Sequence, residues 1–173
     1  MKSSLLFTFI LVAFAASNTL FAQSDKSKRP SPPKVVEGTI DGIKIKVDYS
    51  APSAKGRKVI GGLDPYGKVW RTGANEPTIF EIDQNAKIEG QLLAAGAYDL
   101  FSIPGETEWV IIFQKKGSNK WGAFDYDEKK DLLRVKVSGS KPAAFVETFT
   151  FVIANGQVVF KWENTQVGFK VTK

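Results

Sequence analysis

The residues best suited to chemistry in this chain gather in one short segment, Gly61 to Glu76, with the sequence GGLDPYGKVWRTGANE. Its turn-forming glycines and proline surround two aromatic and four polar side chains: Tyr66, Lys68, Trp70, Arg71, Asn75 and Glu76. An aromatic ring can cover the apolar face of a sugar, and a planar guanidinium beside an amide can bind a carboxylate. The segment therefore predicts a ligand-binding loop.

The same spacing also allows a purely structural interpretation. If residues 69–71 form a short strand, Trp70 faces away from Arg71 and into a core. The turn through Gly73 then brings Glu76 back towards Arg71. We therefore expect a contact between the Arg71 and Glu76 side chains, whether or not a ligand binds there.

A second aromatic group lies in the predicted loop from Trp121 to Tyr126. These rings could stack on sugars, although capping one end of a core is the commoner role of such residues. The acidic run DYDEKKD alternates in the manner of a calcium loop. Lys130, however, stands where the sharp turn of such a loop requires glycine. No metal or cofactor site is therefore predicted.

Histidine and cysteine are both absent from the chain. Their absence excludes His-based catalytic triads, cysteine nucleophiles and imidazole metal sites, and leaves carboxylates, lysines and tyrosines as acid–base groups. A hydrolase could still use a carboxylate pair, such as Glu76 with Asp83 or with Asp125, if the fold held the two carboxyl groups about 5 to 10 Å apart. The sequence contains no recognisable catalytic motif, so enzyme activity is not predicted.

The N-terminus has the features of a secretory signal peptide. Lys2 precedes an apolar run from Leu5 to Ala16 that is too short to span a membrane, and Ala22 supplies a small residue for cleavage. We therefore predict three parts: a signal peptide over residues 1–22, a flexible basic and proline-rich linker over 23–34, and one domain over 35–173. Export to the periplasm or the cell exterior follows from this organisation.

The formal net charge of +6 favours anionic neighbours, but an exported domain rarely meets nucleic acid. The expected partners are therefore a glycan, a peptide or an anionic component of the cell envelope. No nucleic-acid partner and no membrane-spanning segment are predicted.

Beyond Val35 the dominant hydrophobic period is two, which predicts short strands and no substantial helix. The pairs Asp41-Gly42 and Asn155-Gly156 each separate two such strands, as in tight hairpins. About ten strands at this spacing predict an all-β, antiparallel β-sandwich. The alternation places seven residues in its core: Ile45, Val47, Ile111, Phe113, Val135, Phe151 and Phe160.

Three stretches resemble an exported bacterial family known as domain-of-unknown-function family 2911. They are KGRKVIGGLDPYGKVWRTGANEPT from Lys55 to Thr78, AGAYDLFSIPGETEWVIIF and WGAFDYDEKKDLLRVKV. The similarity extends from about Ser31 to Val171. It implies a secreted single domain, and it brings no established catalytic residues.

These observations predict a non-catalytic module of the cell envelope that binds a ligand, such as a glycan. The alternatives are a structural or partner-binding envelope protein and a carboxylate-based hydrolase. The candidate ligand-binding residues are those of the first segment together with Trp121 and Tyr126.

Overall fold

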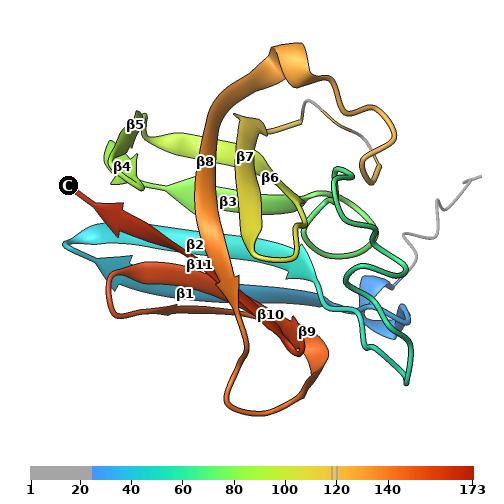
Figure 1. Cartoon of the computed structure of the whole chain (residues 1–173). Coiled ribbons are helices and arrows are strands. Elements are labelled where there is room, and N and C mark those ends of the chain that lie inside the picture. The colour runs from blue at the N-terminus through green and yellow to red at the C-terminus, as the bar shows by residue number, and fades with distance from the viewer. Residues whose placement is uncertain (1–24, 118, 120) are drawn as a thin grey trace, which may run out of the picture.

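Antiparallel strands account for nearly all the regular structure of the computed structural model, which describes residues 25–117, 119 and 121–173 (Figure 1). The described residues form eleven strands: β1 (Pro33–Ile40), β2 (Ile43–Ser50), β3 (Thr78–Ile82), β4 (Ala86–Ile88), β5 (Gln91–Leu93), β6 (Gly96–Ile103), β7 (Glu108–Lys115), β8 (Asp131–Ser140), β9 (Val146–Ala154), β10 (Gln157–Glu163) and β11 (Thr165–Thr172). Two single 3-10 turns, η1 (Lys26–Lys28) and η2 (Glu128–Lys130), complete the list.

The strands follow one path in the order β1-β2-β3-β6-β7-β8-β11-β10-β9, and β4 links β11 to β5. This path folds back on itself, so that β3, β6 and β7 lie above β1, β2, β10 and β11 in Figure 1. The two ends of the path nearly meet. The chain after β2 pairs with β9, because Phe149 N–H donates to Pro52 O and Ala54 N–H donates to Glu147 O, both at 2.8 Å. The predicted antiparallel all-β architecture is confirmed, in a sheet that is nearly closed.

Both predicted hairpins are present. Asp41 and Gly42 have φ values of 51° and 80°, and Asn155 and Gly156 have values of 53° and 73°. Positive φ at both central residues matches the twist of the flanking strands, which is why these dipeptides favour tight turns. The first turn sets the register of β1 on β2, and the second sets that of β9 on β10.

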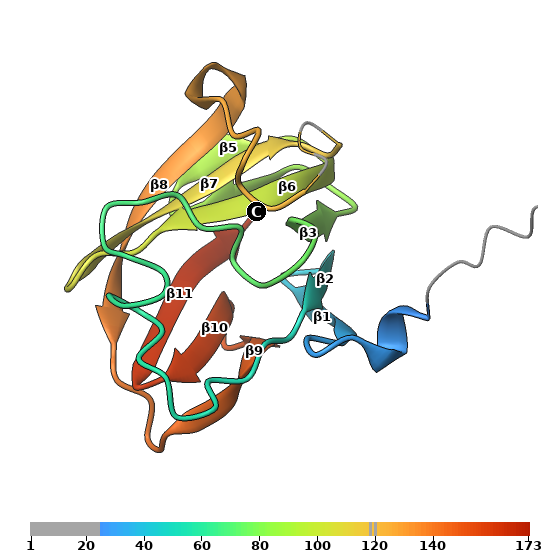
Figure 2. The same cartoon turned by 90° about the vertical axis from the view of Figure 1, so that its right-hand side faces the viewer.

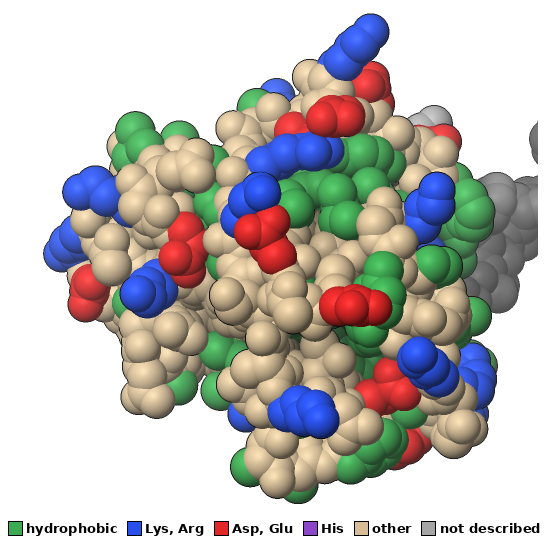
Figure 3. All heavy atoms as spheres, viewed as in Figure 1, with side chains coloured by type: hydrophobic (Ala, Val, Ile, Leu, Met, Phe, Trp, Pro, Cys, Tyr) green, Lys and Arg blue, Asp and Glu red, His purple; other side chains and the backbone are tan. Residues whose placement is uncertain are grey.

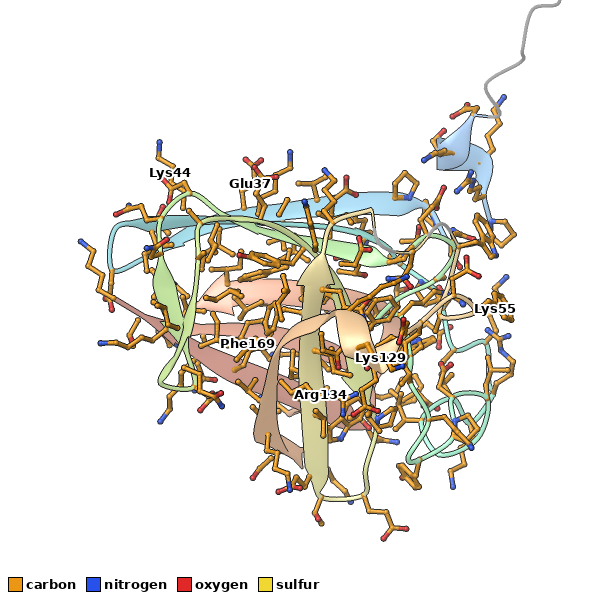
Figure 4. All side chains as sticks on the ribbon, turned by 90° about the horizontal axis from the view of Figure 1, so that it is seen from above. Glu37, Lys44, Lys55, Lys129, Arg134 and Phe169 are labelled. Carbon is orange, nitrogen blue, oxygen red and sulfur yellow. The ribbon has the colours of Figure 1, made fainter. Side chains whose placement is uncertain are left out.

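The core lies between the two layers and consists largely of aromatic and branched aliphatic side chains. All seven predicted core residues are buried, as is Trp162. Figure 4 shows Phe169 of β11 pointing between the layers, whereas Glu37 and Lys44 of the β1–β2 hairpin point outward. A domain without disulfides depends on this burial for its stability.

The central strand β7 is covered on both faces. Trp109, Ile111 and Phe113 belong to the core, while Ile112 is fully buried on the outer face. Phe101 of β6 is also fully buried there, with its ring 5.3 Å from that of Tyr126 in edge-to-face contact. The chain between β7 and β8 therefore covers this part of the outer face.

The segment between β2 and β3 contains no regular strand. Residues 69–71, considered above as a short strand, form only the isolated bridge of Trp70 with Ser102, and Ile60 forms another with Asp64. β4 and β5 are separate strands, because the chain turns between them at Glu89 and Gly90, which have φ values of 48° and 82°.

The N-terminal regions were predicted as a signal peptide and a linker. The predicted signal peptide lies outside the described residues. Within the predicted linker, η1 precedes β1, which begins at Pro33, two residues before the expected domain boundary. No helix in the described part of the chain is long and apolar enough to cross a membrane.

Candidate functional site

The segment that sequence singled out joins β2 to β3 and runs as an irregular teal-to-green chain across the side of the molecule that faces the viewer in Figure 2. Its candidate residues do not converge on one site. Two of them, Trp70 and Glu76, have structural roles. Tyr66 faces a cleft, Lys68 is exposed, and Arg71 and Asn75 lie beside the loop that follows β7.

Trp70 is a core residue, which was the structural alternative for this position. It is 5% exposed, and its ring stacks on that of Trp162 with centroids 5.9 Å apart. Its indole N–H donates to Gly73 O at 3.1 Å, which closes the turn predicted around Gly73. An indole packed in this way has no free face for a ligand.

The expected contact between Arg71 and Glu76 is not formed. Glu76 instead accepts hydrogen bonds from Arg29 Nη1 at 2.9 and 3.0 Å, and Lys26 Nζ lies 3.1 Å from Glu76 Oε1. Burial alone would raise the pKa of Glu76, but the hydrogen bonds from Arg29 and Lys26 outweigh it and lower the pKa to about 2. The sequence interpretation failed because it considered only partners within the loop. The partners of Glu76 come from the N-terminal arm, which is the described chain before β1, and Arg29 lies 47 residues from Glu76 in the sequence.

Asn75 and Arg71 meet the loop that follows β7. Asn75 Nδ2 donates to Ser31 O at 3.0 Å, and Gly122 N–H donates to Asn75 O at 3.2 Å. A Cβ added to Gly122 would lie 2.7 Å from Arg71 Nη1, so the backbone of this loop abuts the guanidinium.

Asp64 is the residue of this segment whose pKa is raised. Burial raises the pKa of Asp64 to about 6, although the positive charges of Arg71 and Arg57 act to lower it.

The two aromatic candidates after β7 differ in exposure and in hydrogen bonding. Trp121 is 47% exposed. Tyr126 O–H donates to Asp131 Oδ2 at 2.8 Å and accepts from Arg134 Nη2 at 2.6 Å. Burial and the bond to Asp131 raise the pKa of Tyr126 to about 12. Tyr126 therefore belongs to a structural network over β6 and β7.

A cleft of about 380 Å³ opens where four connections meet at one end of the sheet. The segment after β2 contributes Lys58, Ile60 and Tyr66, and the β6–β7 turn contributes Gly105 and Glu106. The opposite wall is built by the end of β8 with Lys141 and by the β10–β11 turn, Glu163 to Thr165. Trp109 also lines the cleft. This volume is in the range of small-ligand pockets, about 300 to 1,000 Å³.

Tyr66 packs against the backbone of Gly61 at this cleft. A Cβ on Gly61 would lie 2.6 Å from the tyrosine ring, so the ring packs directly on the glycine backbone. Gly61 also has a φ of 75°, a conformation that other residues rarely adopt. The outer part of Tyr66 remains free, since the residue is 42% exposed. A ring packed on one side and exposed on the other can serve as an aromatic platform for a ligand.

Glu163 fixes the segment that carries Tyr66. Its Oε2 accepts hydrogen bonds from the backbone N–H groups of Val59 and Ile60, both at 3.0 Å. On the adjoining wall, a Cβ on Gly139 would lie 3.0 Å from Trp109 Nε1, so glycine lets the backbone of β8 lie close against this buried indole. The walls thus combine the donors Lys58 and Lys141 with the acceptor Glu106.

The carboxylate pairs considered for hydrolysis are not brought to one cavity. Glu76 and Asp83 line two different cavities, and Asp125 is exposed in the loop after β7. The cleft itself contains two carboxylates, Glu106 and Glu163, but Glu163 is bound to the backbone of the neighbouring segment. Ligand binding is the chemistry that this arrangement favours.

Sequence patterns located Tyr66 but missed the other walls of the cleft. Glu106, Lys141 and Glu163 are common surface residues in separate turns, and only the fold brings them together. The available signal was indirect: Pro104-Gly105 and Asn164-Thr165 are typical of turns, which locates two of the chain reversals but not their proximity.

Comparison with known proteins identifies the family to which this fold belongs. Neither the curated proteins nor the solved structures include a match to the chain. Residues 31–171 match the model of a family described as protein of unknown function (DUF2911), and the chain belongs to this family.

Proposed function

We propose that this domain is a non-catalytic binding module of the cell envelope, and that it takes a short glycan in the cleft beside Tyr66. The observation that carries the proposal is the half-exposed Tyr66 ring, packed on Gly61 at the wall of a cleft of about 380 Å³. Pockets of this kind bind through a few well-placed polar groups around an apolar surface.

The charge of the cleft supports a neutral ligand. Two lysines, Lys58 and Lys141, are balanced by two carboxylates, Glu106 and Glu163. Basic and acidic side chains are likewise interspersed over the face shown in Figure 3. A sugar ring has an apolar face for Tyr66 and hydroxyl groups at its edge that use both donors and acceptors. This combination favours a glycan over a strongly anionic polymer.

The N-terminal sequence supports the location. A basic start followed by a short apolar run and a small residue is typical of secretory signal peptides. We infer export to the periplasm or cell exterior, where envelope glycans are the accessible polymers. Detection of the mature protein, beginning near Gln23, in the periplasmic or extracellular fraction would test this inference.

A thermal-shift screen tests the function. The probes are soluble oligosaccharides, including N-acetylglucosamine oligomers and neutral glucans, together with fragments of cell-envelope glycans. A ligand at about 100 times its Kd should stabilise the native state by about 2.7 kcal/mol, which raises Tm by several degrees. Tyr66→Ala should abolish the shift.

Phe124→Ala is the matched control, since Phe124 is an aromatic residue that is 83% exposed and does not line the cleft. It should keep the full shift. The proposal is abandoned if no oligosaccharide changes Tm, or if both variants respond in the same way. Retention of the domain by an envelope protein after mild crosslinking, with no glycan response, would favour the partner-binding alternative.

A further inference from the structure

Three of the four tryptophans are buried, and two of them donate the indole N–H to an acceptor in the protein. Trp70 Nε1–H donates to Gly73 O at 3.1 Å. Trp162 Nε1–H donates to Glu147 O at 3.2 Å. The third, Trp109, is 1% exposed, and its Nε1–H has no acceptor among the described residues. Buried polar groups are nearly always hydrogen-bonded, so this donor calls for an acceptor that the chain does not supply.

The nitrogen of the Trp109 indole is reached from the cleft beside Tyr66. Two polar side-chain atoms of the described residues are sealed from solvent without a hydrogen bond, Arg71 Nε and Asn119 Oδ1, and Trp109 Nε1 is not one of them. Trp109 lines the cleft, so solvent reaches Nε1 from there. Gly139 lines the same cleft, and a Cβ on it would lie 3.0 Å from Nε1, so a side chain at this position would cover the nitrogen.

The lining of the cleft changes from charged to apolar with depth. Lys58, Glu106 and Lys141 are exposed, so their charges lie at its mouth. Ile60 and Trp109 are 7% and 1% exposed, so they form its inner end. These two buried side chains offer an apolar surface with a single N–H donor.

We propose that the inner end of the cleft recognises the acetamido group of an N-acetylated sugar, whose carbonyl oxygen accepts the hydrogen bond from Trp109 Nε1–H. This inference rests on the glycan-binding function proposed above and names the class of sugar. An acetamido group joins an apolar methyl to a carbonyl acceptor, which matches an apolar surface with one donor. It also extends farther from the sugar ring than a hydroxyl group, so it reaches inward while the ring lies at half-exposed Tyr66.

A hydroxyl group fits the inner end less well than a carbonyl group. A hydroxyl is a donor as well as an acceptor, and neither Ile60 nor the Trp109 indole can accept its hydrogen. Its O–H would therefore be buried unpaired, which is costly. The N–H of an acetamido group avoids this cost, because it lies next to the sugar ring and nearer the polar mouth. The cleft should consequently prefer N-acetylated sugars to plain glucans.

Nitrogen-15 NMR tests this bond, because indole N–H resonances lie apart from those of backbone amides and Trp109→Phe identifies the one from Trp109. The probes are the trisaccharides of N-acetylglucosamine, glucosamine and glucose with the same linkage. The N-acetylglucosamine trisaccharide should move the Trp109 indole resonance saturably and bind about three- to tenfold more tightly than the glucose trisaccharide, as expected for one hydrogen bond. The indole resonances of Trp70 and Trp162, which are already bonded, should stay in place.

Two variants remove the preference by different routes. Trp109→Phe deletes the N–H, and Gly139→Ala covers it while the indole remains. In each, the ratio of the two affinities should fall to about one. Gly168→Ala is the matched control, because a Cβ there would lie 2.9 Å from Gln157 Oε1, a similar crowding, and Gly168 does not line the cleft. It should keep the ratio of the wild type.

The outcomes separate this inference from the proposed function. If the N-acetylglucosamine and glucose trisaccharides bind equally and both depend on Tyr66, the acetamido inference is overturned and glycan binding stands. If no trisaccharide binds, both fail. An unmoved Trp109 indole resonance, tightest binding of the glucosamine trisaccharide, or a preference that persists in Gly139→Ala would also overturn the inference.

Discussion

Arg134 and Arg71 both project from the outer face of the sheet, and they differ in every contact that the guanidinium makes. Arg134 bonds Asp131 through Nε and Tyr126 through Nη2, and its Nη1 lies 3.2 Å from Glu128. For Arg71, the Nε is buried without a hydrogen-bond partner among the described residues. The same residue type thus braces the fold in one region and has an unpaired buried nitrogen in the other.

The comparison extends to the regions around the two arginines. Around Arg134, polar groups bond one another: Gln114 Nε2 donates to Asp131 Oδ1 at 2.6 Å, and Gln114 Oε1 accepts from Asn119 Nδ2 at 2.9 Å, although Asn119 Oδ1 is buried without a partner among the described residues. In the segment that carries Arg71 and Tyr66, Trp70 and Glu76 are held by protein contacts, whereas Tyr66 faces a cleft and Lys68 is exposed. Polar networks rigidify a fold, whereas exposed side chains at a cleft are available to a ligand. The predictions below test this difference in order of expected effect.

The largest loss of stability should come from Asp131→Ala. The Asp131 side chain is 8% exposed and accepts from Gln114, Tyr126 and Arg134. Its removal leaves three donors unpaired, one of them charged, which should cost about 3 to 5 kcal/mol of unfolding free energy. Urea denaturation measures this loss. Asp125→Ala, at an exposed position in the same loop, should change stability by less than about 0.5 kcal/mol. Similar losses at the two positions would contradict the assignment of Asp131.

Arg134→Gln should have a smaller effect. The Arg134 side chain is 33% exposed, so in the variant water can replace part of the hydrogen bonding that its partners lose. A cost of about 1 to 2 kcal/mol of unfolding free energy is therefore expected. Lys136→Gln is the control on the same face of β8, where Lys136 pairs with Glu108 at 2.8 Å but is 71% exposed. It should cost less than about 0.5 kcal/mol. If the Lys136 variant were as unstable as the Arg134 variant, Arg134 would not be a brace.

The N-terminal arm gives a pH-dependent effect of smaller size. The pKa of Glu76 is lowered to about 2, so its pairing contributes stability above the ordinary glutamate pKa, and this contribution is lost as pH falls towards 2. Because the side chain is 36% exposed, the contribution should stay below about 1 kcal/mol. Arg29→Gln should raise the Glu76 pKa, as measured by carbon-13 NMR. Lys28→Gln, which lies on the same arm, should leave this pKa unchanged, and an equal rise in both variants would refute the specific pairing.

The smallest effect on stability is expected for Arg71→Gln. Since the buried Nε has no hydrogen-bond partner among the described residues, the unfolding free energy should change by less than about 0.5 kcal/mol, or increase. Combined with Glu76→Ala, the two changes should add within about 0.5 kcal/mol, because the side chains do not touch. A coupling above about 1 kcal/mol in this double-mutant cycle would show that the two residues form a brace after all.

The sequence predicted those parts of the structure that local rules determine. Asp41-Gly42 and Asn155-Gly156 form the expected hairpins because the preference of such dipeptides for tight turns depends only on two adjacent residues. Ile111 is buried as predicted because the alternation of side chains along a strand is also local. Glu76 was assigned the wrong partner because its true partner, Arg29, lies 47 residues away. The cleft was only partly predictable for the same reason, since its walls come from four separate connections.

The most direct test of the central claim is a backbone nitrogen-15 NMR titration with the oligosaccharide that gives the largest thermal shift. Ligand binding in the cleft predicts saturable amide shifts near Ile60, Tyr66, Glu106 and Thr165, with the network around Gln114 and Asp131 unaffected. The same titration of Tyr66→Ala should give no saturable shifts. Shifts centred on the network, or an unchanged response in Tyr66→Ala, would contradict the account.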